Sequence, residues 1–143
     1  MKKNFVIIFI SMIVFFINHS FANIKNSYFE DGKKLFDNKK FKDSKFYFEK
    51  DIVFNPKSEN SYLYLAKIFK EEEDSNLEEN NLNTVLLLNP KNEEAIFNLA
   101  KLKLESSDYK KSKELNDRLK SFCNKFCNES KKLKIEIENL SKK

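Results

Sequence analysis

The sequence predicts an all-α protein built from a repeated pair of helices, and three observations support this fold class. FNPKSENSYLYLAKIF begins at Phe54, and LNPKNEEAIFNLAKLK begins 34 residues later at Leu88, with seven of sixteen positions identical. Within each copy, apolar residues recur at i, i+3 and i+4, which is the period of an amphipathic helix. The only two prolines, Pro56 and Pro90, also lie 34 residues apart, and nothing between or beyond them alternates like a strand.

Residues 1–22 have the features of a Sec-type signal peptide. Two lysines precede an apolar run over residues 5–17, and Ser20-Phe21-Ala22 has small residues where signal peptidase requires them. A helix of thirteen residues rises about 20 Å, which is less than the ~30 Å hydrocarbon core of a bilayer. We therefore expect a cleaved signal and a periplasmic location. The alternative is an uncleaved membrane anchor formed by residues 5–17.

The composition argues against several classes of function. The single histidine and both methionines lie within residues 1–22, and the only glycine is Gly32. The rest of the chain therefore lacks the commonest general base and metal ligand, and it cannot form a glycine-rich phosphate loop. The removed segment carries two lysines and no acidic residue, so the formal charge falls from +5 to +3. We expect no enzyme, cofactor, metal or nucleic-acid partner, and contact with a membrane only during export.

A 34-residue period made of two helices, with a proline near its end, resembles the tetratricopeptide repeat. In that family the fourth, eighth and eleventh residues of a repeat are large, small and large, which lets two antiparallel helices approach each other. The matching residues are Tyr28, Gly32 and Leu35, then Tyr62, Ala66 and Phe69, then Ile96, Ala100 and Lys103. The resemblance implies a TPR-type α-solenoid with three helix-turn-helix repeats at about residues 25–58, 59–92 and 93–124.

Two residues in the second helices of the repeats depart from the family pattern. Asp51 and Glu78 stand where the resemblance expects a small residue. Ser75-x-x-Glu78 matches a capping box, in which the glutamate serves the start of a helix. We therefore expect Glu78 at a helix end and not in the core.

A final helix at about residues 128–140 is predicted to cap the repeats. Leu133, Ile137 and Leu140 share one face of it, and the opposite side is mostly charged. Stacked repeats need such an end helix because the last repeat otherwise exposes its core. The repeats and this helix are expected to form one domain over residues 23–143.

Cys123 and Cys127 lie between the last repeat and the capping helix with C-x3-C spacing. We expect a disulfide, because an even cysteine count suits an exported protein and Asn124-Lys125 favours a turn that brings the two Cβ atoms together. One alternative is a redox-active pair, although such pairs more often have C-x2-C spacing. Another is a Cu(I) site, for which the usual third ligand, His or Met, is missing after residue 22.

The resemblance places the fifth and ninth residues of each repeat on the concave face of the solenoid. The fifth residues are apolar and the ninth are lysines, so we expect an exposed apolar column beside a lysine column, with polar groups nearby. The candidate site is a groove lined by Phe29, Lys33, Leu63, Tyr64, Lys67, Phe97, Asn98 and Lys101. The alternative is that the capping helix folds over the apolar column.

Such a groove predicts a protein or peptide partner. Family members that hold the carboxylate-ended tails of cytosolic chaperones use Lys as the fifth and Asn as the ninth residue of the first repeat. Here these residues are Phe29 and Lys33, so that clamp is not expected.

The function predicted from the sequence is a non-enzymatic periplasmic adaptor or scaffold that binds a peptide or helix of another envelope protein. Scarce arginine together with abundant Asn, Ile and Phe is typical of an AT-rich bacterial genome, which favours a bacterial envelope. One alternative function is a thiol–disulfide accessory that uses Cys123 and Cys127. Another is a self-associating scaffold, that is, a homo-oligomer.

Overall fold

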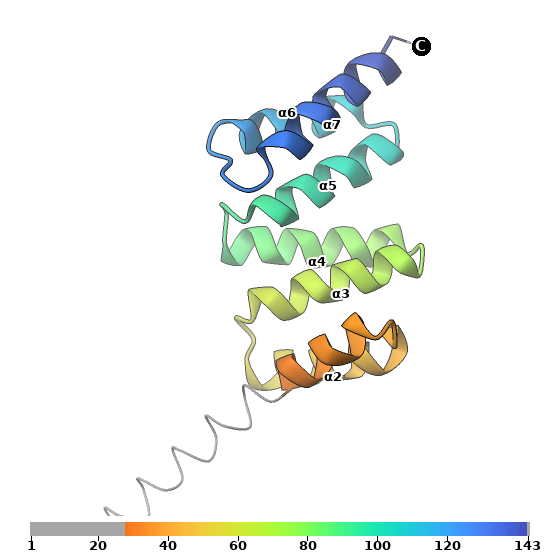
Figure 1. Cartoon of the computed structure of the whole chain (residues 1–143), viewed down its shortest axis with the longest axis vertical. Coiled ribbons are helices and arrows are strands. Elements are labelled where there is room, and N and C mark those ends of the chain that lie inside the picture. The colour runs from red at the N-terminus through yellow and green to blue at the C-terminus, as the bar shows by residue number, and fades with distance from the viewer. Residues whose placement is uncertain (1–27, 143) are drawn as a thin grey trace, which may run out of the picture. The chain divides into compact units, whose positions relative to one another are not determined.

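The computed structural model describes residues 28–142, and these residues form seven helices and no strands (Figure 1). The chain divides into two compact units, one ending at Pro56 and the other beginning at Lys57. The first unit contains a helix over residues 28–37 and α2 (Phe41–Phe54). The second unit contains α3 (Glu59–Glu71), α4 (Ser75–Leu88), α5 (Glu93–Glu105), α6 (Tyr109–Lys120) and α7 (Cys127–Leu140). The predicted all-α fold of three helical pairs and a capping helix is confirmed.

The expected signal segment, residues 1–22, lies outside the described residues, and so does the alternative anchor at residues 5–17. Cleavage and export therefore stay predictions. Within residues 28–142, no helix is both long enough and apolar enough to cross a bilayer.

The same turn joins the two helices of each repeat. The residues with positive φ, spaced 34 apart, are Lys39, Glu73 and Ser107, at 58°, 58° and 63°. A residue in this left-handed conformation ends a helix and lets the following N–H bond back to a carbonyl of the last turn. In the second repeat, for example, the N–H of Asp74 donates to the carbonyl of Phe69 at 2.9 Å. The repetition of one turn explains why the helices recur with a fixed period.

The start of α4 corrects one expectation from the sequence. The N-cap is Asp74, whose Oδ1 accepts the N–H of Leu77 at 3.0 Å, and Ser75 is already the first helical residue. Glu78 therefore lies too far into the helix to complete a capping box, and it is only 4% exposed. Burial raises the pKa of Glu78 above its ordinary value; the charge of Lys70 opposes this rise and that of Glu105 adds to it.

The first unit packs through its glycine. A Cβ built on Gly32 would lie 2.8 Å from Cε1 of Phe48, so the phenyl ring occupies the space that any larger residue would need. Next to this contact, the Oγ of Ser44 donates to the carbonyl of Gly32 at 2.7 Å. Gly32, which the resemblance predicted as the small residue of this repeat, therefore lets the two helices pack closely.

The core of the second unit is continuous from α3 to α7. Its fully buried side chains include Leu82 on α4, Ile96 on α5 and Leu119 on α6. The capping helix α7 contributes Leu133 and Ile137, which are 2% and 4% exposed. The apolar face predicted for the last helix thus packs against the end of the third repeat, while its charged face remains in solvent.

Candidate functional site

Six of the eight predicted groove residues belong to α3 and α5 of the second unit. Lys67 on α3 forms an ion pair with Glu94 on α5, with 2.6 Å between Nζ and Oε1. The same Nζ lies 4.5 Å from the centre of the Tyr64 ring, which is a cation–π distance. The facing sides of α3 and α5 are therefore linked by charge, and Lys67 is already engaged within the protein.

The apolar column that the sequence predicted is not exposed at Leu63. This side chain is 5% exposed and belongs to the core cluster together with Ala66 and Leu82. Leu63 therefore contributes to stability and offers little surface to a partner. The prediction was wrong here because the burial of a helix face depends on neighbours outside the helix, which periodicity does not show.

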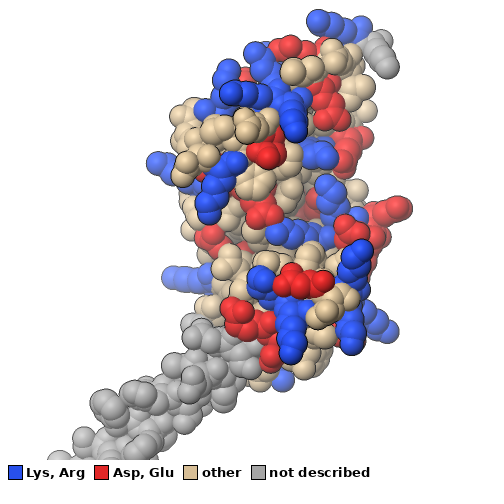
Figure 2. All heavy atoms as spheres, viewed as in Figure 1, with Lys and Arg blue, Asp and Glu red and all other residues tan. Residues whose placement is uncertain are grey.

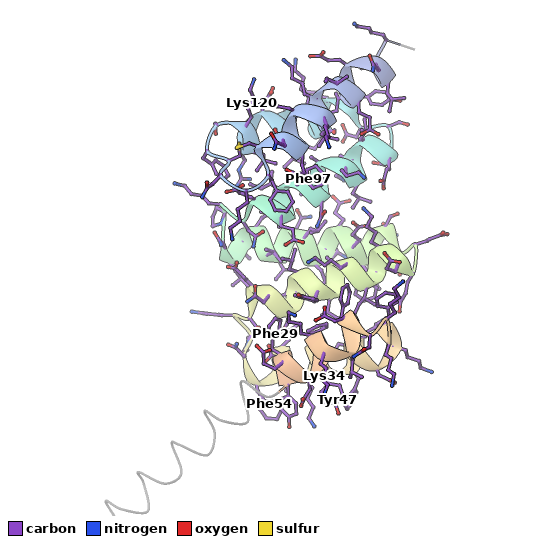
Figure 3. The ribbon with its side chains drawn as sticks, in the orientation of Figure 1. Phe29, Lys34, Tyr47, Phe54, Phe97 and Lys120 are labelled. Atoms are coloured by element: carbon purple, nitrogen blue, oxygen red, sulfur yellow. A yellow bond between two sulfur atoms is a disulfide. The ribbon has the colours of Figure 1, made fainter. Side chains whose placement is uncertain are left out.

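Phe97 fits the alternative in which the end of the chain covers some of the column. Its ring is partly buried and lies 5.5 Å, centre to centre, from the ring of Phe126, which directly precedes α7. In Figure 3, Phe97 projects from α5 towards that end of the chain. The Phe97 side chain therefore has internal contacts and also keeps part of its surface accessible.

A cleft of about 200 Å³ lies between α5 and α7. It is lined by Phe97, Lys101, Glu129, Lys132, Leu133 and Glu136. Two predicted groove residues, Phe97 and Lys101, thus meet four residues of the capping helix. The capping helix was expected to cover the last repeat, with the alternative that it folds over the apolar column, but it was not expected to line a binding site. Residues 129, 132, 133 and 136 nevertheless follow the i, i+3, i+4, i+7 pattern of one helix face.

The cleft carries both signs of charge around an apolar centre. Its two lysines and two glutamates, Lys101, Lys132, Glu129 and Glu136, form no ion pair among the described residues. The Oε2 of Glu129 is buried and accepts no hydrogen bond from any of residues 28–142. On the face shown in Figure 2, basic and acidic side chains are likewise interspersed. Such a site can take an apolar side chain and can also donate to and accept from polar groups beside it.

Phe29 and Lys33, the remaining predicted groove residues, belong to the first unit. The Phe29 ring lies 5.8 Å from that of Phe48, and Nζ of Lys33 lies 2.8 Å from Oδ2 of Asp37. A separate pocket of about 470 Å³ in this unit includes Tyr47 and the 58% exposed Phe46. No pattern in the sequence had predicted this pocket.

The predicted disulfide is present. Cys123 and Cys127 are bonded, with their Cα atoms 5.3 Å apart, so neither thiol is free to bind a metal. Between them, the consecutive N–H groups of Asn124, Lys125 and Phe126 donate to the two carboxylate oxygens of Glu93, each at 2.9 Å. These hydrogen bonds, with that of Phe126 first, hold the pKa of Glu93 below its ordinary value.

Glu59 makes related contacts in the preceding repeat. Its Oε1 accepts hydrogen bonds from the side-chain amides of Asn89 and Asn92, each at 3.0 Å. Glu59 and Glu93 are the first residues of α3 and α5 and lie 34 positions apart. Glu59 therefore binds the segment that leads into α5, and Glu93 binds the segment that leads into α7. The sequence contained the signal, because this glutamate is one of the seven identities between the two copies.

Solved structures with a similar backbone include two that hold peptides. The type III secretion chaperone SycD of Yersinia enterocolitica, in complex with a peptide of the translocator YopD, matches with a TM-score of 0.73 and 15% identity over 82% of this chain and 94% of that chain. The first TPR of Spaghetti (RPAP3), bound to an HSP90 peptide, matches with a TM-score of 0.69 and 16% identity over 80% and 93% of the two chains.

A third similar structure is the Sgt2 TPR domain of Aspergillus fumigatus, with a TM-score of 0.69 and 13% identity over 83% of this chain and 82% of that chain. Neither a protein-family model nor a curated protein matches the sequence. The fold is therefore established by the backbone, the 34-residue period and the repeated turn. Together they show that this chain has the tetratricopeptide-repeat fold.

Proposed function

We propose that this protein is a non-enzymatic adaptor that binds a peptide or helical segment of another protein, with the cleft between α5 and α7 as the main contact. The observation that carries the proposal is the cleft itself. Phe97 supplies its accessible apolar surface, Leu133 lies buried beneath it, and the four charged side chains at its border form no ion pair among residues 28–142. A partner can place an apolar side chain on Phe97 and pair its own charged groups with those at the border. The peptide-bound SycD and RPAP3 structures support this function for the fold.

The magnitudes indicate which contacts should dominate the affinity. The cleft, with a volume of about 200 Å³, suits the insertion of one large side chain of the partner. Burial of such a side chain is worth about 1.5–3 kcal/mol, whereas an exposed ion pair is worth about 0–1 kcal/mol. The apolar insertion should therefore set the affinity, and Lys101 and Lys132 should mainly set charge preference. A Kd in the micromolar range is expected after the cost of ordering a peptide.

The partner is proposed to be an envelope protein, because residues 1–22 match a secretory signal. The mature chain should begin at Asn23 and be released from cells by osmotic shock. N-terminal sequencing of the released protein checks this, and an intact Met1 in the membrane pellet would contradict it.

The binding site can be tested with a photo-crosslinking residue placed at Lys101, and at the exposed Asn83 on α4 as a matched control. Irradiation of living cells should produce an adduct from position 101 that is missing from position 83. Peptides tiling the captured protein are then titrated against the purified chain. One of them should bind, and Phe97→Ala should weaken it about tenfold, which corresponds to roughly 1.4 kcal/mol. Equal adducts from both positions, or unchanged affinity in the variant, would refute the site.

A further inference from the structure

The segment that joins α6 to α7 is closed by a covalent bond at its two ends. Cys123 and Cys127 are four positions apart and form the disulfide. Both cysteines are partly exposed, so a small reductant can reach the bond. We call residues 123–127 the disulfide loop. The bond restricts the backbone of the three residues that it encloses, because a closed loop this short has few conformations.

Those three enclosed residues all use their backbone to hold one side chain. The N–H groups of Asn124, Lys125 and Phe126 converge on the carboxylate of Glu93 at the start of α5. Convergence of successive N–H groups on one anion requires a particular backbone conformation. The disulfide and the Glu93 contacts therefore favour the same shape of the loop.

The same loop also contacts the cleft. Phe126 is both a donor to Glu93 and the ring that lies 5.5 Å from Phe97. Phe97 in turn lines the cleft between α5 and α7. A continuous series of contacts thus leads from the disulfide, through the loop backbone and Phe126, to the candidate binding site.

The rest of α7 is held independently of the loop. Leu133 and Ile137 are buried in the core, and the side-chain amide of Asn116 on α6 donates to the carbonyl of Ser130 at 3.0 Å. Loss of the disulfide should consequently loosen the loop while α7 stays in place. This separation makes a local change possible without unfolding.

We propose that the Cys123–Cys127 disulfide is a redox-sensitive latch: a dithiol reductant opens it, the loop releases Glu93, and Phe126 leaves Phe97, which reshapes the cleft. The consequence for partner binding rests on the proposed function, whereas the latch itself does not.

The reaction is a thiol–disulfide exchange. A thiolate of the reductant attacks one of the two Sγ atoms, the S–S bond breaks, and the other sulfur leaves as a thiolate that takes up a proton. The second thiol of the reductant then displaces the protein sulfur from the mixed disulfide. Two electrons and two protons pass to the cysteines, and the reductant leaves as a disulfide.

The latch can be tested without a partner, by amide hydrogen exchange and ring contacts measured by NMR. The purified protein is compared oxidised, after reduction with dithiothreitol, and as the double variant Cys123→Ser/Cys127→Ser. In both disulfide-free forms, exchange at Asn124, Lys125 and Phe126 should rise roughly tenfold, and the Phe97–Phe126 ring contact should weaken. The control is the segment held by Glu59, where no disulfide is present and exchange at Asn92 should not change.

Two results would overturn the proposal. If the three amides and the ring contact are the same with and without the disulfide, the bond does not control the loop. If exchange rises throughout α3–α7, the disulfide is a general stabiliser and not a local latch. The double variant keeps the experiment decisive, because it separates loss of the bond from side effects of the reductant. Since no partner is used, failure here is distinct from failure of the proposed binding function.

Discussion

The backbone N–H of Phe126 donates a hydrogen bond of 2.9 Å to Oε2 of Glu93, so the first residue of α5 holds the residue before α7. The equivalent Glu59 holds Asn89 and Asn92 ahead of α5. In both copies the glutamate ends an Asn-Pro-Lys-x-Glu motif. The repeated motif therefore not only turns the chain but also fastens one repeat to the next.

The first prediction concerns Glu93→Gln. A neutral amide accepts weaker hydrogen bonds than a carboxylate, so unfolding free energy at pH 7 should fall by about 1–2 kcal/mol. The pKa of Glu93 is lower in the folded than in the unfolded protein. Glu93 therefore stabilises the fold above the unfolded pKa, and this stabilisation is lost as the pH falls through the folded pKa. The difference in unfolding free energy between wild type and variant should therefore become smaller as the pH is lowered. Urea denaturation across that range measures it.

The matched control for this variant is Glu114→Gln on α6. Among residues 28–142, Glu114 forms only an exposed pair with Lys111, so its loss should cost about 0–0.5 kcal/mol. Equal effects of the two substitutions would mean that the loop contacts of Glu93 contribute nothing beyond a surface charge.

The second prediction concerns Glu78→Gln. Burial raises the pKa of Glu78, so its charged form is disfavoured in the folded protein. Because the pKa of Glu78 is higher in the folded than in the unfolded protein, its full contribution to the free energy of unfolding is present below the unfolded pKa. That contribution is lost as the pH rises through the folded pKa. The variant should consequently be more stable than wild type near neutrality, by about 1 kcal/mol, and equal to it near pH 4. A variant less stable at pH 7 would show that the attraction between Glu78 and the charge of Lys70 outweighs burial.

The third prediction concerns Gly32→Ala. The new Cβ would lie 2.8 Å from Cε1 of Phe48, so the ring must move, at a cost of about 1–3 kcal/mol. In the second repeat the equivalent residues are Ala66 and Leu82, which share one core cluster. Adding Phe48→Leu should therefore restore much of the loss. Thermal unfolding of the single and double variants measures it, and Phe48→Leu alone is the control. No recovery in the double variant would exclude a steric cause.

The fourth prediction concerns the aromatic pair Phe97 and Phe126. Their rings lie 5.5 Å apart and tilted by 42°, a geometry worth about 0.5–1.5 kcal/mol beyond area burial. A double-mutant cycle with Phe97→Ala and Phe126→Ala should show coupling of that size in unfolding free energy. Additive losses would mean that the two rings are merely neighbours. Any test of partner binding with Phe97→Ala must therefore be corrected for the folded fraction.

Features that depend on nearby residues were predictable from the sequence. The helical pairs followed from apolar spacing within about a dozen positions, and the repeat followed from identity at a fixed offset. The disulfide followed from two cysteines four positions apart around a turn-forming pair. The left-handed residues Lys39, Glu73 and Ser107 were not foreseen, because none is a glycine and their conformation is imposed by the helices that they join.

Contacts between distant residues were decided only by the tertiary structure. Leu63 had the spacing of an exposed position, yet core residues from other helices enclose it. The carboxylate of Glu93 meets three amides more than thirty positions away, and the cleft joins α5 to a helix that the sequence marked only as a cap. Local sequence determines which face of a helix is apolar. What that face meets depends on packing between helices, and packing therefore decides which residues remain available to a partner.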